Sequence, residues 1–426
     1  MCGIIAIVRR RATRPVPTSD DIRALLPASS GELAADPDAI SALAVQFEAV
    51  NRALAGVPGV TCLINDPSLM AAVTHTIDIA DADVQALEAA LDRWEDSEAL
   101  EAVNAALLAL KDALWAIGRD RLRTARAVDD LCQGSRTIGS VEAFTSIQEA
   151  LSAIDRLEVR GRDSAGLHLL VRGHALDLDA AEVADEIARR GADRNFGSGS
   201  VRRADGHLGF VYKAAAEIGE LGDNTDALRA AIREDSLLHR ALANDTASVA
   251  VLGHTRWASV GIISEPNAHP LSSEQDNGQS CPFVTAALNG DVDNFADIRA
   301  AEGLEIAPAI STDAKVIPTL MAKHLEATDE RAELAGVDES FRRTVAALEG
   351  SVAIAANAAA TPNRLHLALR GSGQALYVGL AEDAYIVASE PYGVVETTSR
   401  YVRMDGETPG NPDNPTASRG QMLSLD

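Results

Sequence analysis

Met1-Cys2-Gly3-Ile4-Ile5-Ala6-Ile7-Val8-Arg9 opens the chain. The β-branched, apolar run from Ile4 to Val8 predicts a buried strand. If Met1 is removed, Cys2 carries both a thiol and a free α-amine. Because an α-amine titrates near about 7.7–8.0, it can accept the thiol's proton and make Cys2 a nucleophile. On these residues alone, an incidental cysteine beside a buried strand remains an alternative.

Composition limits the classes of protein that fit. The chain has 426 residues, 46% of them hydrophobic, enough for a large core or two domains. Its net charge of −25 disfavours nucleic-acid and anionic-membrane partners, and no apolar run is long enough to span a membrane. Its four cysteines (Cys2, Cys62, Cys132 and Cys281) show neither disulfide nor zinc spacing. We therefore expect a cytoplasmic protein without a metal or cofactor.

Two stretches interrupt the predicted strands. Residues from about 10 to 150 contain helical periodicity, with an apolar seam that either packs against the layers formed by the predicted strands or recruits a partner. A break is expected at residues 61–66. A second enlarged stretch covers about residues 172–246. The last hundred residues alternate short strands and turns, typical of antiparallel sheet, and the Pro/Asn/Gly-rich residues 408–426 resemble the start of a linker.

Amide hydrolysis by a thiolate also needs oxyanion donors and groups that hold the substrate. Asn289-Gly290 offers a side-chain amide and a backbone N–H, although Asn-Gly is also a common hairpin turn. Arg256 suits a substrate carboxylate, or else a surface ion pair. Asp313 suits a substrate ammonium, or else caps a helix. Each residue taken alone leaves both interpretations open.

The order of the motifs is more specific than any one of them. The chain contains Met1-Cys2-Gly3-Ile4, Arg160-Gly161-Arg162-Asp163-Ser164-Ala165-Gly166, His254-Thr255-Arg256-Trp257-Ala258-Ser259, Asn267-Ala268-His269-Pro270, Asn289-Gly290 and Ser311-Thr312-Asp313. In these motifs and their order, the chain resembles the class II glutamine amidotransferases, and most closely the glutaminase domain of glucosamine-6-phosphate synthase. The resemblance covers roughly 250 of the 426 residues.

The resemblance implies an α+β fold, the four-layer αββα sandwich of the N-terminal-nucleophile hydrolases, here spanning residues 1–426 with a large helical insertion after the first strand. It implies that Cys2 is the nucleophile and that its α-amine is the base. Further roles follow by position in the motifs: Asn289 and Gly290 as the oxyanion hole, Arg256 and Asp313 on the two charged ends of glutamine, Trp257 and Ser259 in the closing loop, and His269 and Arg160 as further substrate-binding residues.

Departures from the family pattern are also visible. Val260 stands where a histidine is usual, and Arg162 where a tyrosine is usual. Neither supplies the nucleophile or an oxyanion donor, so these changes bear on substrate affinity and loop closure. The sugar-phosphate isomerase domains that follow in the synthase are absent from this sequence.

The expected activity is that of the glutaminase half of an amidotransferase, which releases ammonia from L-glutamine. The ammonia acceptor would be a sugar-phosphate isomerase domain or subunit, and homo-oligomer formation is left open. Two alternatives remain at this point. A non-catalytic scaffold could use the helical insertion to recruit a partner, or the same nucleophile could hydrolyse a different amide. Arg256 and Asp313 speak against the different amide, because together they match the two charged ends of an α-amino acid.

Overall fold

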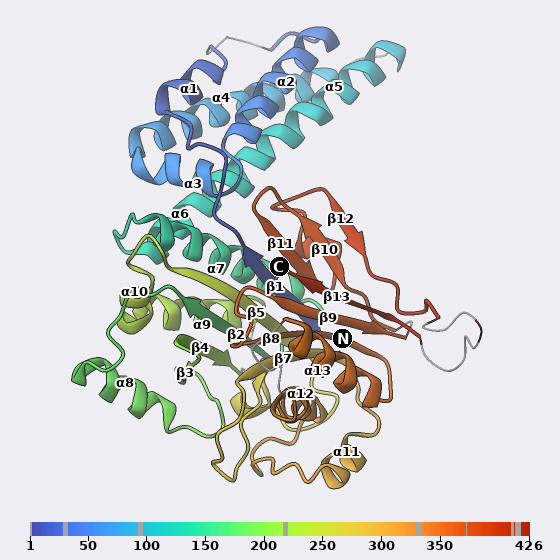
Figure 1. The fold of residues 1–426 in the computed structure, drawn as a ribbon. Coiled ribbons are helices and arrows are strands. Elements are labelled where there is room, and N and C mark those ends of the chain that lie inside the picture. The colour runs from blue at the N-terminus through green and yellow to red at the C-terminus, as the bar shows by residue number, and fades with distance from the viewer. Residues whose placement is uncertain are drawn as a thin grey trace. The chain divides into compact units, whose positions relative to one another are not determined.

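The computed structural model describes residues 2–28, 33–92, 97–215, 220–328, 334–371, 373–409, 413 and 419–426. The chain forms two compact units (Figure 1). One comprises Met1–Arg10 with Thr137–Asp426, and the other comprises Arg11–Arg136. Among the residues described, no helix has both the length and the apolar character needed to cross a bilayer. We describe each unit separately.

The second unit, residues 11–136, is helical. Its helices are α1 (Ser19–Leu25), α2 (Pro37–Ala53), α3 (Gly56–Asn65), α4 (Pro67–Leu91), α5 (Ser97–Trp115), the π-helix η1 (Ala116–Leu122) and α6 (Arg123–Cys132). The break expected at residues 61–66 is confined to Asp66, because residues 61–65 belong to α3. The chain turns at Asp66, whose side chain accepts hydrogen bonds from the first turn of α4.

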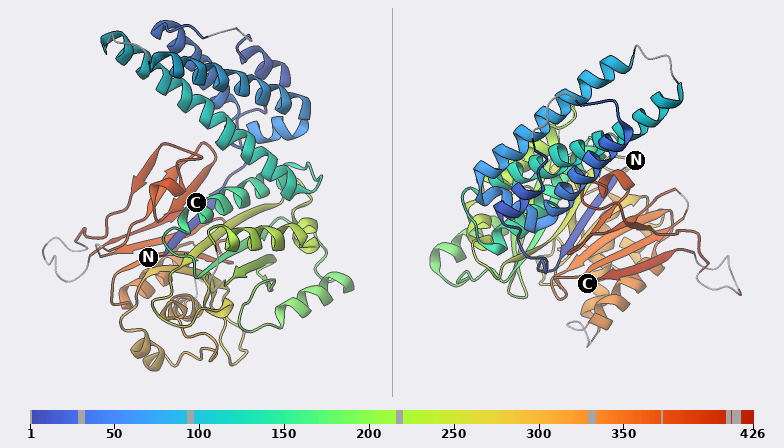
Figure 2. Two further views of the ribbon diagram at one scale, coloured as in Figure 1. Left: turned by 180° about the vertical axis from the view of Figure 1, so that it is seen from behind. Right: turned by 90° about the horizontal axis from the view of Figure 1, so that it is seen from above.

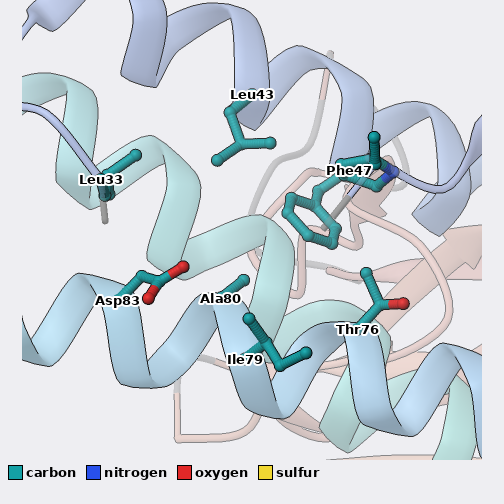
Figure 3. A pocket seen from close by; sticks show the side chains of 9 residues that line it. Leu33, Leu43, Phe47, Thr76, Ile79, Ala80 and Asp83 are labelled. Atoms are coloured by element: carbon teal, nitrogen blue, oxygen red, sulfur yellow. The ribbon is translucent and has the colours of Figure 1, made fainter. Parts of the chain in front are cut away.

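The apolar seam predicted for this stretch is buried between helices of the helical unit. Leu107, Leu110 and Leu114 of α5 are buried, as are Leu87 and Leu91 of α4. Helix α5 packs against both α2 and α4. Figure 3 shows a small apolar hollow between α2 and α4. The seam is thus covered by neighbouring helices of its own unit. One predicted member, Trp94, lies outside the described residues.

The first unit contains two antiparallel sheets. The eight-stranded sheet has the order β12 (Tyr401–Arg403), β10 (Tyr377–Leu380), β11 (Ala384–Ala388), β1 (Gly3–Arg9), β5 (Ser248–Arg256), β2 (Ser164–Arg172), β4 (His207–Ala214) and β3 (Val201–Ala204). The five-stranded sheet has the order β13 (Gln421–Leu425), β9 (Leu365–Arg370), β8 (Val352–Ala358), β7 (Val284–Gly290) and β6 (Leu271–Ser272). The predicted mixture of helices with antiparallel sheet is confirmed.

Side-chain alternation along the strands explains how the layers pack. On β8, Ala353 and Ala355 join Ile4 and Ala6 of β1 in a core between the two sheets. Ile354 and its alternate neighbours on β8 face the opposite way, into a core shared with α12 (Val316–Glu326) and α13 (Leu334–Ala347). Helix α7 (Ile138–Leu157) packs on β1 and β5 (Figure 2). Strand β1 is therefore covered along its length.

Several segments depart from the expected boundaries. Helix α7 begins within the predicted insertion of about residues 10–150. It nevertheless packs on the sheet, and nearly all of its side chains are buried. Residues 172–246 add β3 and β4 to the sheet, together with α8 (Ala181–Gly191), α9 (Asp223–Glu234) and α10 (Ser236–Leu242). Within the supposed linker, β13 pairs with β9. A short helix, α11 (Phe295–Ala301), follows β7.

Candidate active site

Strand pairing brings together residues that lie far apart in the sequence. Strand β1 pairs with β5 so that Gly3 lies opposite Thr255. Cys2 therefore lies beside Trp257, which follows the end of β5. From the other sheet, the Asn289 side chain at the end of β7 donates a hydrogen bond of 2.9 Å to the Cys2 carbonyl. The structure thus places Cys2, Trp257 and Asn289 in one site.

The Cys2 thiol lies against the backbone of Trp257. Its Sγ is 3.3 Å from the Trp257 amide nitrogen and 3.4 Å from the Trp257 carbonyl oxygen. Burial raises the pKa of the thiol, whereas the Trp257 N–H and the Arg256 charge lower it. Thiolate formation therefore depends on a nearby base or on these donors.

Arg256, the last residue of β5, is a buried cation that is held by backbone carbonyl groups. Its guanidinium donates to the backbone carbonyls of Val260 and Ile262 and is 3% exposed. No described carboxylate lies within ion-pairing distance of it. Burial lowers its pKa, while Cys2 and Asp313 raise it. A buried guanidinium without a counter-ion fits an incoming carboxylate.

One carboxylate, Asp313, lies near this cation, and a second, Asp291, lies near Asp313 and Cys2. Asp313 begins a short 3₁₀ helix, η3 (Asp313–Lys315), and accepts a 2.7 Å hydrogen bond from the Val292 amide. Burial raises the pKa of Asp313, and so does the charge of Asp291. Asp291 directly follows Gly290, and its charge also raises the pKa of Cys2. This local excess of negative charge suits an ammonium group.

Position 290 requires glycine, because the backbone there leaves no room for a side chain. Its φ is +121°, and a Cβ there would lie 2.0 Å from the Ser351 carbonyl oxygen. Only glycine can therefore end β7 in this conformation. Asn-Gly here closes a strand of the five-stranded sheet opposite Val352, so the two residues do not form a two-residue hairpin.

Two stacked histidines hold the strand that carries Asn289. His254 donates from Nε2 to the Leu288 carbonyl at 2.8 Å, and the Leu288 amide donates to Nδ1 of His269 at 3.3 Å. Their ring centroids are 4.4 Å apart. Burial lowers the pKa of His254 to about 3 and lowers that of His269 well below its ordinary value. Both rings are neutral near pH 7, so their contacts position β7.

The segment after Arg256 contacts the site through its side chains and backbone. The Ser259 hydroxyl donates to Asp291 at 2.9 Å, and the Ala258 amide donates to Asp163 at 2.8 Å. Trp257 is 57% exposed. Asp163 belongs to the motif that begins at Arg160, so this motif supports the segment that follows β5.

Arg160 has a different environment from the other predicted substrate-binding residues. It forms an ion pair with Glu390. The preceding Ser389 exchanges hydrogen bonds with Ile4 of β1 and accepts one from Asn289. Arg160 thus ties its motif to the end of β11. Sequence reasoning missed Ser389, and it missed Asp291 although this residue directly follows the Asn289-Gly290 motif.

Comparisons with known proteins were made on the sequence and on the fold. No family model matches the chain. Glutamine–fructose-6-phosphate aminotransferase (isomerizing) of Bacillus thuringiensis subsp. konkukian is 30% identical over 254 residues, which is 60% of this chain and 32% of that protein. The protein of that name from Chlamydia pneumoniae is 28% identical over 256 residues, 59% of this chain and 31% of that protein. The resemblance to the class II glutamine amidotransferases is confirmed.

The similarity has a limited extent. The chain spans about a third of the length of the curated aminotransferases that it matches. Among solved structures, a glutamine phosphoribosylpyrophosphate amidotransferase from B. subtilis matches with 15% identity and a TM-score of 0.36, over 65% of this chain and 46% of that one. In the part of the chain that the structure describes, no group of three acidic, histidine or cysteine side chains is arranged to bind a metal.

Proposed function

We propose that the chain is the glutaminase part of a glutamine-dependent amidotransferase. The observation that carries this proposal is a buried Arg256 that has no ion pair with any described carboxylate and that lies near both the buried Asp313 and the Cys2 thiol. Free α-amino acids carry a carboxylate and an ammonium, and these two residues offer the matching charges. Aminotransferases that act with glutamine match 60% of the chain, which supports the same substrate.

The proposed reaction uses Cys2 after removal of Met1. The Sγ attacks the side-chain amide carbon of glutamine, and its proton passes to the Cys2 α-amine. The Asn289 amide and the Gly290 N–H stabilise the oxyanion of the tetrahedral intermediate. Collapse breaks the C–N bond, the α-amine returns the proton to the leaving nitrogen, and ammonia departs. Water then hydrolyses the γ-glutamyl thioester to glutamate, and the thiol is restored.

Arg256 and Asp313 fix the position of the substrate rather than react with it. A guanidinium binds a carboxylate in a bidentate manner, which leaves the glutamine side chain to extend toward Cys2. Ser259 and Trp257 belong to the segment that would close over the bound amino acid, and the Ser259–Asp291 hydrogen bond would hold that segment in place. His269 and Arg160 support this arrangement through β7 and the end of β11.

Labelling of Cys2 tests the proposal directly. Intact-mass measurement first establishes whether Met1 is removed. The processed protein should then gain one mass equivalent of an electrophilic glutamine analogue, and glutamate should protect it. Cys2→Ala should abolish both labelling and glutaminase turnover, while Cys62→Ala should preserve them because Cys62 is buried in the helical unit. Full turnover by Cys2→Ala would overturn the mechanism.

The fate of the ammonia is a further part of the proposal. The matched aminotransferases are named for fructose-6-phosphate, so we propose a sugar-phosphate isomerase domain or subunit in the cytoplasm as the acceptor. Adding such a partner should convert glutamine consumption into stoichiometric amino-sugar phosphate. If processed protein shows neither labelling nor turnover, the non-catalytic scaffold becomes the better interpretation.

A further inference from the structure

A second cleft lies in the first unit, at the end of β1 remote from Cys2. Its volume is about 580 Å³, within the range typical of small-molecule sites. It is lined by the ends of strands from both sheets and by the turn between β10 and β11. Its polar lining residues are Arg9, Arg10, Arg172, Asn363, Glu382, Asp383, Tyr385, Arg400 and Asp426.

Three of these arginines have no ionic partner among the described residues. Arg10 donates one hydrogen bond of 3.1 Å to the Glu382 carbonyl oxygen, and no described carboxylate lies within 4 Å of Arg10, Arg172 or Arg400. Such a cluster stands out in a chain with a net charge of −25, where carboxylates greatly outnumber basic groups. The neighbouring Arg9 shows the contrast, because it is paired at 2.6 Å with both Glu149 and Asp383.

Arg172 is the most buried of the three. It is the last residue of β2 and is half-buried. Burial lowers its pKa, and the charge of Asp426 only partly offsets this effect. A half-buried guanidinium is expensive to leave without an anion. Because three separate segments supply the guanidiniums, they can surround one anion from different directions.

We propose that this cleft binds a small phosphate-bearing molecule, with Arg172, Arg400 and Arg10 holding the phosphate. A phosphate offers several oxygens to planar guanidiniums, whereas a carboxylate is satisfied by one bidentate arginine. The cleft volume exceeds what an inorganic phosphate fills. Tyr385, Asn363 and the carboxylates of Glu382 and Asp426 can then bind hydroxyl groups on the remainder of the ligand.

The charge of the chain and the residues that line the cleft restrict the class of phosphate compound that can bind. Nucleic acid is disfavoured because the overall negative charge repels a polyanionic backbone. A phosphate monoester of a sugar or nucleoside fits both the volume and the mixture of cations with hydroxyl-binding groups. The site is separate from Cys2, since the whole length of β1 lies between them.

Calorimetric titration of the full chain in phosphate-free buffer tests the proposal. The probes are inorganic phosphate, a hexose 6-phosphate and a nucleoside monophosphate, with glucose as the uncharged comparison. We expect saturable binding of at least one phosphate monoester, tighter than inorganic phosphate, and no binding of glucose. Raising the salt concentration should weaken the binding.

Variants identify the site. Arg400→Glu replaces an exposed side chain, and Arg172→Ala removes the half-buried cation; each should weaken binding at least tenfold. Arg403→Ala changes an exposed arginine on β12 that does not line the cleft and should leave binding within twofold. Thermal melting confirms that each variant is folded. The proposal is overturned if no phosphate compound binds saturably, or if Arg400→Glu binds as the unaltered protein does.

Discussion

Each end of β1 lies beside a buried arginine, and the two arginines have opposite surroundings. Arg9 is paired at 2.6 Å with both Glu149 and Asp383, and it also donates to Ser146 at 2.9 Å. Arg256, beside Cys2, contacts only backbone carbonyls among the described residues. A buried charge must be compensated. The charge at the Arg9 end is compensated by the protein itself, whereas at the Cys2 end we propose that a bound ligand compensates it.

The comparison predicts that losing Arg9 damages folding. Arg9→Met would leave Glu149 and Asp383 buried without their cation, so the free energy of unfolding should fall by about 3–5 kcal/mol. Urea denaturation measures this change. Arg342→Met, which removes an exposed ion pair with Glu339, is the control and should leave the free energy of unfolding almost unchanged, because solvent screens exposed ion pairs. Equal effects of the two substitutions would contradict the assigned role of Arg9.

At the Cys2 end, the largest catalytic effect short of losing the nucleophile is expected at Asn289. Asn289→Ala removes a donor proposed for the oxyanion hole, which is worth about 2.7–4 kcal/mol. Glutaminase kcat should therefore fall at least about a hundredfold, with a small change in KM. Ser389→Ala is the matched control, because it removes a neighbour of Asn289 without removing the amide donor. A similar loss of kcat in both variants would indicate a positioning role for Asn289.

Arg256→Met should weaken glutamine binding without lowering stability, whereas Arg9→Met should lower stability. Losing a charge-assisted contact to the glutamine carboxylate costs about 1.5–3 kcal/mol, or roughly ten- to a hundredfold in KM. Stability should be preserved or improved, because an uncompensated buried charge is removed. Steady-state kinetics and urea denaturation of the same sample measure both effects. A normal KM together with a large loss of stability would show that Arg256 is structural.

The sequence predicts which residues form the candidate site better than it predicts the contacts that hold those residues in place. Cys2 precedes β1, Arg256 ends the neighbouring strand β5, and Asn289 lies at the end of β7 in the other sheet; the motifs that contain these residues were enough to group them. The ion pair of Arg160 with Glu390 was not predictable in this way, because it depends on how the turn before β2 meets the end of β11. The neutral histidine pair under Leu288 likewise depends on burial between two sheets.

Errors in the fold have similarly local causes. The break expected at residues 61–66 was placed too early: burial of Leu63 and Ile64 continues α3 to Asn65, and tertiary packing overrides weak propensity. Strand β13 was missed because the Pro/Asn/Gly-rich residues before it dominate the local composition. Its pairing with β9, more than fifty residues earlier, leaves no local signal.

The smallest predicted effect concerns Asp291, which combines two functions at the Cys2 end. It accepts the Ser259 hydroxyl, and its charge raises the pKa of Cys2. Asp291→Asn keeps an acceptor for Ser259 but removes the charge, so the pKa of Cys2 should fall. The acid limb of the kcat/KM profile, where Cys2 must lose its proton, should then shift to lower pH by less than about one unit.

Ser259→Ala separates the two functions of Asp291. It removes the hydrogen bond but leaves the carboxylate charge in place. We therefore expect a higher KM for glutamine and an unchanged acid limb. Because screening reduces the influence of an exposed charge, the shift caused by Asp291→Asn should also shrink at high salt. A shift that persists unchanged in high salt would mean that Asp291 acts through the hydrogen-bonded segment rather than through its charge.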